Sequence, residues 1–148
     1  MMIELALRVA AAPHWYWMPG MQVLIVDERL RIAAERRLRV GVTTHRLVEA
    51  YGPRFRAAPD LGDPATLGCA REILARAWGD REPEVVRSFF TRPPETWKVE
   101  YWDAPPQVQR IRTVLLYAPS ENVALAEAIL LAPALQRVEP APHFVVDD

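Results

Sequence analysis

The segment "HWYWMPGM" concentrates the aromatic side chains that could bind a planar ligand. Trp15, Tyr16 and Trp17 follow one another, and a methionine stands on each side of a Pro-Gly pair. Aromatic faces stack on nucleic-acid bases, and methionine adapts to irregular surfaces. If the segment is extended, however, Trp15 and Trp17 share one side and pack on the core, while His14, Tyr16 and Met18 face outward. The segment is therefore either part of the core or a stacking surface.

Arginine side chains form a second group, whose chemistry is the binding of anions. Residues 29–56 contain eight arginines and two glutamates, although the whole chain has a formal net charge of −1. Guanidinium groups bind phosphate and carboxylate oxygens at two points. The alternation in "RLRIAAERRLRVGV" predicts a hairpin that turns near residues 34–36, with one buried face and one arginine face. The arginine face comprises Arg29, Arg31, Arg37 and Arg39.

Like charges opposite one another on paired strands destabilise a sheet, so this arginine face requires an explanation. One explanation is that water solvates the arginine side chains and that Glu28 and Glu35 offset part of their charge. The other is an anion site that takes either phosphate groups or an acidic protein surface. The sequence leaves both explanations open.

Residue types that carry catalysis or bind metals form no recognisable motif in this chain. The three histidines lack a cysteine or acidic partner at a zinc-ligand spacing, and the six glycines form no phosphate-binding loop. Ser120 is better explained as a helix cap, and Cys69 as a small helix residue rather than a catalytic thiol. Acidic residues such as Asp63 and Glu72 have capping and ion-pairing roles. We therefore expect no catalytic residue, no metal site and no cofactor.

Hydrophobic periodicity indicates the helices that must support these groups. A helix over residues 3–12 is followed by a longer one that begins after Asp63 and ends at Gly79. A last helix, "ENVALAEAILLA", begins after Ser120 and ends before Pro133. Its few polar residues indicate either deep burial or a subunit interface, so a homo-oligomer is one expectation.

Strands are indicated by continuous or alternating apolar runs. "QVLIVD" is typical of a strand covered on both faces, and the arginine hairpin follows it. Residues 43–62 are expected to form a loop with one helical turn, and "TWKVEYW" and "RIRTVLLYA" two more strands. From Gln136 onward the chain is expected to form a loop or an edge strand. The order α-β-β-β-α-β-β-α predicts a single α+β domain over residues 1–148, an antiparallel sheet of about five strands packed by two or three helices.

Composition limits the class of protein. Hydrophobic residues make up 51% of the 148 residues, enough for the buried core of one domain. No apolar run is long enough to cross a membrane, and the N-terminus lacks the layout of a secretory signal, so we expect a cytoplasmic protein without a membrane partner. A net charge near zero argues against coating of DNA, which relies on many phosphate contacts, and the chain has no strong nucleic-acid signature.

Two separated motifs resemble those of a known family. "WYWMPGM" and "PDLGDPATLGC", followed by "SENVALAEAILLAP", resemble a family of small bacteriophage and prophage proteins of GC-rich hosts. In that family W-x-W-M-P-G-M is followed by P-D-L-x-D-P-A-T-L-G-C and by a short C-terminal helix. The matches cover residues 5–21, 59–80 and 120–133. The resemblance implies a phage context and no particular activity.

A phage context favours functions based on binding. Small accessory phage proteins often act on the host, either by sequestering a nucleotide signal or by covering the surface of a defence protein. We expect a non-enzymatic protein of the host-cell cytoplasm that binds a host-derived ligand, with a nucleotide signal slightly favoured. Its base would stack on Trp15, Tyr16 and Trp17, and its phosphates would be neutralised by the arginine face. The alternative is a protein-interaction module that masks a host defence protein, and a third hypothesis is an enzyme of unrecognised type.

Overall fold

The structure is a computed structural model that describes residues 2–79, 83–87, 97–102 and 112–132. Within these residues the elements are α1 (Met2–Ala10), β1 (Gln22–Val26), β2 (Ile32–Arg37), α2 (Thr44–Glu49), β3 (Arg56–Pro59), α3 (Pro64–Trp78), β4 (Glu84–Arg87), β5 (Trp97–Trp102), β6 (Arg112–Ala118) and α4 (Glu121–Leu130). The predicted tail from Gln136 and the stop at Pro133 lie outside the described residues.

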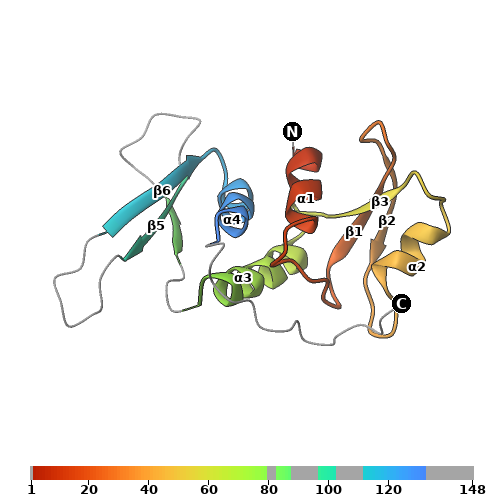
Figure 1. Ribbon diagram of the computed structural model, residues 1–148, viewed down its shortest axis with the longest axis horizontal. Coiled ribbons are helices and arrows are strands. Elements are labelled where there is room, and N and C mark those ends of the chain that lie inside the picture. Colours follow the sequence, from red (N-terminus) through yellow and green to blue (C-terminus); the bar gives the residue numbers. More distant parts are fainter. Residues whose placement is uncertain (1, 80–82, 88–96, 103–111, 133–148) are drawn as a thin grey trace.

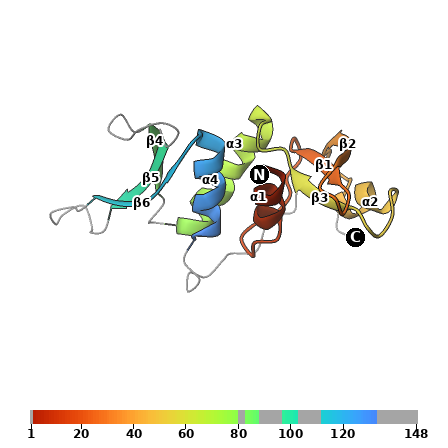
Figure 2. The ribbon, with the colours of Figure 1, turned by 90° about the horizontal axis from the view of Figure 1, so that it is seen from above.

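The strands form two antiparallel sheets, in the orders β2-β1-β3 and β4-β5-β6. The α+β class is therefore confirmed, whereas the prediction of one sheet of about five strands is wrong. Helices α1, α3 and α4 lie between the two sheets, so the helices separate them (Figures 1 and 2). One hydrophobic cluster runs through this middle layer and includes Leu24 of β1 and Val99 of β5. Both sheets thus share a core that the helices provide.

The first sheet is built on β1, whose side chains are buried on both faces as its continuous apolar run predicts. Val23, Leu24, Ile25 and Val26 are all buried. Leu24 and Val26 belong to the cluster that includes α1 and α3, and α2 contacts β1 and β3. In Figure 1 α2 lies on the side of this sheet away from α1. Strand β1 therefore supports both the middle layer and the outer helix.

The predicted hairpin within residues 29–42 is wrong, because the turn lies earlier in the chain. Strand β2 pairs with β1, and Arg37 stands opposite Gln22. The turn between them is fixed by Asp27, whose Oδ1 accepts the backbone N–H groups of Arg29 at 2.8 Å and Arg31 at 2.9 Å. Leu30 has a φ of 62°, a conformation that glycine or asparagine usually occupies. The usual sequence signal of such a turn is therefore missing.

Strand β2 does not have the buried face that its alternation predicts. It lies at the edge of its sheet, and Ile32 is 47% exposed. Beyond it Val40 is 77% exposed, whereas Leu38 is buried. All of its residues except Ala34 are exposed, so neither face of β2 is covered.

The predicted caps of α3 and α4 are confirmed, whereas α1 and α4 end at Ala10 and Leu130, two residues earlier than expected. The carboxylate of Asp63 accepts the backbone N–H of Thr66 at 3.0 Å, and the φ of Gly79 is 60°. Ser120 accepts the backbone N–H of Val123 at 3.4 Å. Helix α3 is tied to α4 by the indole N–H of Trp78, which donates to a buried carbonyl at 2.9 Å. Helix α4 has five buried side chains, which agrees with the deep burial that its composition suggested.

In the second sheet β5 is the central strand, and it carries the chain's one lysine. Val99 points into the hydrophobic cluster, while Nζ of Lys98 lies 3.2 Å from Oε2 of Glu100. Glu100 is only 2% exposed, so this ion pair is largely shielded from solvent.

No helix among the described residues is long and apolar enough to traverse a lipid bilayer.

Candidate functional site: an aromatic segment and an arginine-rich end

The aromatic segment connects α1 to β1 and packs against the hydrophobic core. Trp15, Tyr16 and Trp17 are each partly buried against the cluster, and the rings of Trp15 and Trp17 meet edge to face with centroids 5.6 Å apart. His14 and Met18 are 8% and 7% exposed, so the expectation that they face outward is wrong. The segment therefore contributes to the core, with three aromatic rings only partly accessible.

Tyr16 is held against one face of α3. The guanidinium carbon of Arg76 lies 5.8 Å from the centre of the Tyr16 ring. Burial is the main cause that raises the pKa of the Tyr16 hydroxyl; Arg76 acts against this rise, and Glu72 and Cys69 add to it. Burial also raises the pKa of the Cys69 thiol, which favours the unreactive protonated form. Tyr16 therefore packs against the side chains of α3.

Three consecutive residues of the segment bury polar atoms that have no hydrogen-bond partner in the part of the chain that the structure describes. These atoms are Nδ1 of His14, Nε1 of Trp15 and the hydroxyl oxygen of Tyr16. A buried polar group without a partner destabilises the fold by about 1–3 kcal/mol. Burial also lowers the pKa of His14, which favours its neutral form. The segment is thus packed inward at a cost in stability.

The four arginines of the predicted face do not lie together. Arg29 and Arg31 belong to the turn between β1 and β2, and Arg37 and Arg39 lie at the other end of β2. Arg31 and Arg37 are six residues apart along extended chain, which at about 3.4 Å per residue separates them by roughly 20 Å. The hairpin of β1 and β2 turns at residues 27–31, so Arg31 lies at the turn and Arg37 lies at the far end of β2.

Arg37 is the arginine of this set that the structure brings to the aromatic segment. Its guanidinium donates to the carbonyl of Gly20 at 2.8 Å and contacts both carboxylate oxygens of Asp63. The hydrogen bond from Arg37 is the main cause that lowers the pKa of Asp63 to about 2. Arg37 is therefore engaged within the fold rather than free for a ligand.

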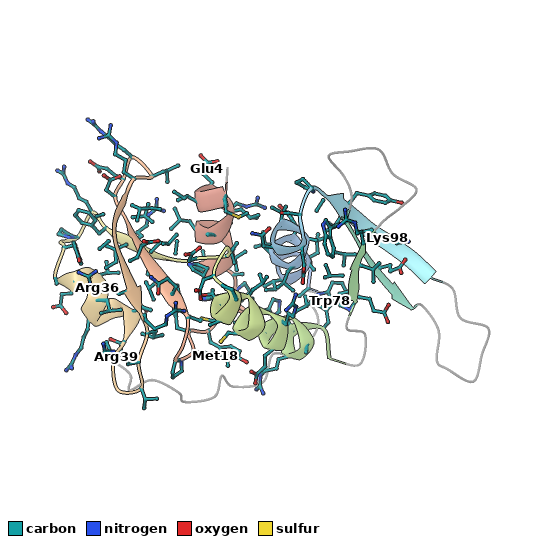
Figure 3. All side chains as sticks on the ribbon, turned by 180° about the vertical axis from the view of Figure 1, so that it is seen from behind. Glu4, Met18, Arg36, Arg39, Trp78 and Lys98 are labelled. Atoms are coloured by element: carbon teal, nitrogen blue, oxygen red, sulfur yellow. The ribbon has the colours of Figure 1, made fainter. Side chains whose placement is uncertain are left out.

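To three arginines of the predicted face the structure adds four that the sequence reasoning did not single out: Arg36, Arg46, Arg54 and Arg56. We call this group the arginine-rich end; it lies on β2, α2, β3 and their connections and comprises Arg29, Arg31, Arg36, Arg39, Arg46, Arg54 and Arg56. All seven are exposed, and Figure 3 shows Arg36 and Arg39 beside α2 at this end of the molecule. The eight arginines within residues 29–56 were the available signal, but only the pairing of β2 with β1 and the position of α2 place them at one end of the molecule, spread over the length of β2.

Most of these guanidinium groups have no carboxylate partner among the described residues. Arg54 lies 3.5 Å from Glu28, and Arg36 donates to the hydroxyl of Tyr51 at 3.0 Å. Within the described residues, the other members of the group have no carboxylate oxygen within 4.0 Å: Arg29, Arg31, Arg39, Arg46 and Arg56. By contrast, Arg8 and Arg71, on α1 and α3, are paired with Glu127 and Glu121 of α4. Positive charge is thus balanced around the helices and unbalanced at the arginine-rich end.

An open hollow of about 300 Å³ lies beside the turn between β1 and β2. Its lining consists of Asp27, Glu28, Arg29, Arg31, Arg54 and Phe55. The ring of Phe55 is 5.8 Å from that of Tyr51, centre to centre. At this hollow the arginines of the turn between β1 and β2 meet an aromatic side chain, and that side chain is Phe55, outside the aromatic segment.

Within the described ranges, no group of three or more histidine, cysteine or acidic side chains is arranged to hold a metal ion. Comparison of the chain with protein-family models, with curated proteins and with solved structures gives no match. The function must therefore be argued from the side chains themselves.

Proposed function

We propose that this protein acts by binding rather than by catalysis, and that its arginine-rich end binds an acidic surface of a protein partner. One observation carries the proposal: exposed arginines without a carboxylate partner among the described residues gather at one end of the molecule. Arginine is enriched among the residues that dominate binding energy at protein interfaces. Its planar guanidinium also pairs with carboxylates at two points.

The spread of these arginines supports a large partner. Arg31 and Arg39 lie at the two ends of β2, and Arg46 lies on α2, so one small ligand cannot contact all three. A protein surface that carries several carboxylates can do so. Complementary charge over such an area speeds association and selects between partners.

The phage context of the proposal rests on the resemblance of "WYWMPGM" and "PDLGDPATLGC". Within it, the partner is a host defence protein in the host-cell cytoplasm, whose surface this chain covers. The sequestration of a nucleotide signal is the second candidate function. It is favoured by the hollow that Arg29, Arg31 and Phe55 line, and not by the tryptophan segment.

A fluorescein-labelled oligoglutamate peptide is the probe that tests this surface. Its anisotropy with the full chain is measured at increasing salt, and we expect binding at low salt that weakens as salt rises. The variant Arg39→Gln/Arg46→Gln is expected to bind about two- to thirtyfold more weakly, since exposed ion pairs contribute about 0.2–1 kcal/mol each.

The matched control is Arg8→Gln/Arg71→Gln, which removes the same charge from the helices and should bind as the wild type does. An equal loss in both double variants would contradict the proposal, because net charge alone would then explain the binding. Tighter binding of a duplex DNA of equal charge at the same salt would also contradict it, and would assign the surface to nucleic acid instead.

A further inference from the structure

The hollow beside the turn between β1 and β2 combines an aromatic ring with two guanidinium groups, those of Arg29 and Arg31, that have no carboxylate partner among the described residues. Arg29 and Arg31 line it from the turn, and Phe55 lines it from the segment before β3. Its volume of about 300 Å³ is at the lower end of the range for small-molecule sites. We infer that this hollow binds a nucleoside phosphate, with the phosphate between Arg29 and Arg31 and the base against Phe55.

The backbone that carries the two arginines is held in place before any ligand arrives. Asp27 accepts the N–H groups of residues 29 and 31, its own N–H donates to the Arg31 carbonyl at 3.0 Å, and the N–H of Leu30 donates to the Asp27 carbonyl at 3.1 Å. Leu30 is partly buried against the hydrophobic cluster, which anchors the turn to the core. A fixed turn reduces the ordering that a ligand must impose, and this favours binding.

The two carboxylates in the hollow are both engaged with other groups. Asp27 binds the backbone of the turn, and Glu28 lies 3.5 Å from Arg54. Arg29 and Arg31, in contrast, have no ion-pair partner among the described residues, so their charge remains available to an anion. A terminal phosphate has three acceptor oxygens and up to two negative charges, so it suits two guanidinium groups better than a carboxylate, which has two oxygens and one charge.

Two contacts hold Phe55, the aromatic residue of the hollow, in position. The backbone N–H of Phe55 donates to the carbonyl of Gly52 at 3.3 Å, and the Tyr51 ring lies against the Phe55 ring at 52°. Phe55 is partly buried, so part of its surface remains accessible. A flat base can stack on such a ring without a specific hydrogen-bond pattern.

This site deepens the second candidate function and rests on it; it shares Arg29 and Arg31 with the arginine-rich end but does not depend on the protein interface. The interface test relies on Arg39 and Arg46, whereas the hollow relies on Arg29, Arg31 and Phe55. Either proposal can therefore fail while the other stands.

ADP is the probe, titrated by calorimetry into the full chain at low salt, with adenosine and inorganic phosphate as its separate parts. We expect ADP to bind more tightly than either part. Arg29→Gln/Arg31→Gln should weaken both ADP and phosphate by about tenfold or more. Phe55→Leu should weaken ADP by about fivefold or more and leave phosphate unchanged, while Phe55→Tyr, which keeps a ring, should retain ADP binding.

Two further variants make the test specific. Glu28→Gln removes a negative charge from the hollow and releases Arg54, so it should tighten ADP binding. Arg39→Gln/Arg46→Gln removes two arginines outside the hollow and should leave ADP binding unchanged. The inference is overturned if ADP does not bind, if this control weakens ADP as much as Arg29→Gln/Arg31→Gln does, or if phosphate binds as tightly as ADP and Phe55→Leu has no effect.

Discussion

Arg37 and Asp63 meet in a two-point contact that joins strand β2 to the first turn of α3. Nη1 of Arg37 lies 2.6 Å from Oδ2 of Asp63, and Nη2 lies 3.0 Å from Oδ1. The same guanidinium reaches the carbonyl of Gly20 at the end of the aromatic segment. One side chain therefore holds three segments of the chain together, which explains why this arginine differs in role from its neighbours.

Replacement of Asp63 should destabilise the fold, and the loss should be smaller where the new side chain keeps a cap acceptor. Asp63→Ala loses both the helix cap and the contact with Arg37, and it should lower the free energy of unfolding by about 1–2 kcal/mol. Asp63→Asn keeps a cap acceptor and should lose less. Urea unfolding measures both, with Arg54→Gln, from the exposed pair with Glu28, as a control that should change by less than about 0.5 kcal/mol. Equal losses in the two Asp63 variants would contradict a capping role.

The same carboxylate predicts how stability depends on acid. The pKa of Asp63 is about 2 in the folded chain, below its ordinary value of 3.8, chiefly because Arg37 donates to it. The unfolded chain therefore takes up this proton first as the pH falls. The stabilisation is present above about pH 4 and is lost toward about pH 2. We expect the difference in unfolding free energy between wild type and Asp63→Asn to shrink over that range, and a constant difference would refute the linkage.

His14 predicts a second pH dependence at milder acidity. Burial lowers the pKa of His14 below its ordinary value of 6.5, so the unfolded chain binds this proton at a higher pH than the folded chain does. Stability should fall as the pH drops through 6.5 toward the lower folded value. Unfolding measured at a series of pH values should show a shallower fall for His14→Gln. His45→Gln, on the exposed side of α2, leaves His14 in place and serves as the control.

Tyr16→Phe should stabilise the protein, in contrast to most core substitutions. It removes a buried hydroxyl that has no hydrogen-bond partner and keeps the ring beneath Arg76. We expect the free energy of unfolding to rise by up to about 1 kcal/mol. Tyr51→Phe is the matched comparison, because it removes a hydroxyl that accepts a hydrogen bond from Arg36 and should lower stability slightly. Thermal unfolding of both variants decides the matter, and a clear destabilisation by Tyr16→Phe would show that its hydroxyl is satisfied.

The helices and the buried strand could be predicted from sequence because their signals are local. The caps at Asp63 and Ser120 and the continuous apolar run of β1 each specify an element without reference to the rest of the chain. The short strands β3 and β4 have four residues each and no clear period, so they were missed. The division into two sheets depends on which strands pair, and this is a long-range property.

The candidate sites were harder to predict for the same reason. The turn between β1 and β2 could not be recognised from the sequence, because a leucine, Leu30, takes the left-handed conformation that glycine or asparagine usually occupies. The expected hairpin therefore turned too late in the chain and placed Arg29 opposite Arg39, whereas Arg37 pairs with Gln22. Nothing in local spacing indicates that Phe55 joins the arginines of that turn, because this contact depends on the fold of the intervening residues.

The single lysine has a practical consequence for experiments on this protein. Lys98 is the only lysine side chain in the sequence, and Figure 3 shows it at the opposite end of the molecule from Arg36 and Arg39. The Lys98 side chain is only 23% exposed and is paired with buried Glu100, so amine-reactive reagents meet one partly shielded lysine, on β5. Lysine-directed cross-linking or acylation therefore leaves the arginine-rich end unmodified, and arginine-directed reagents are needed to label it.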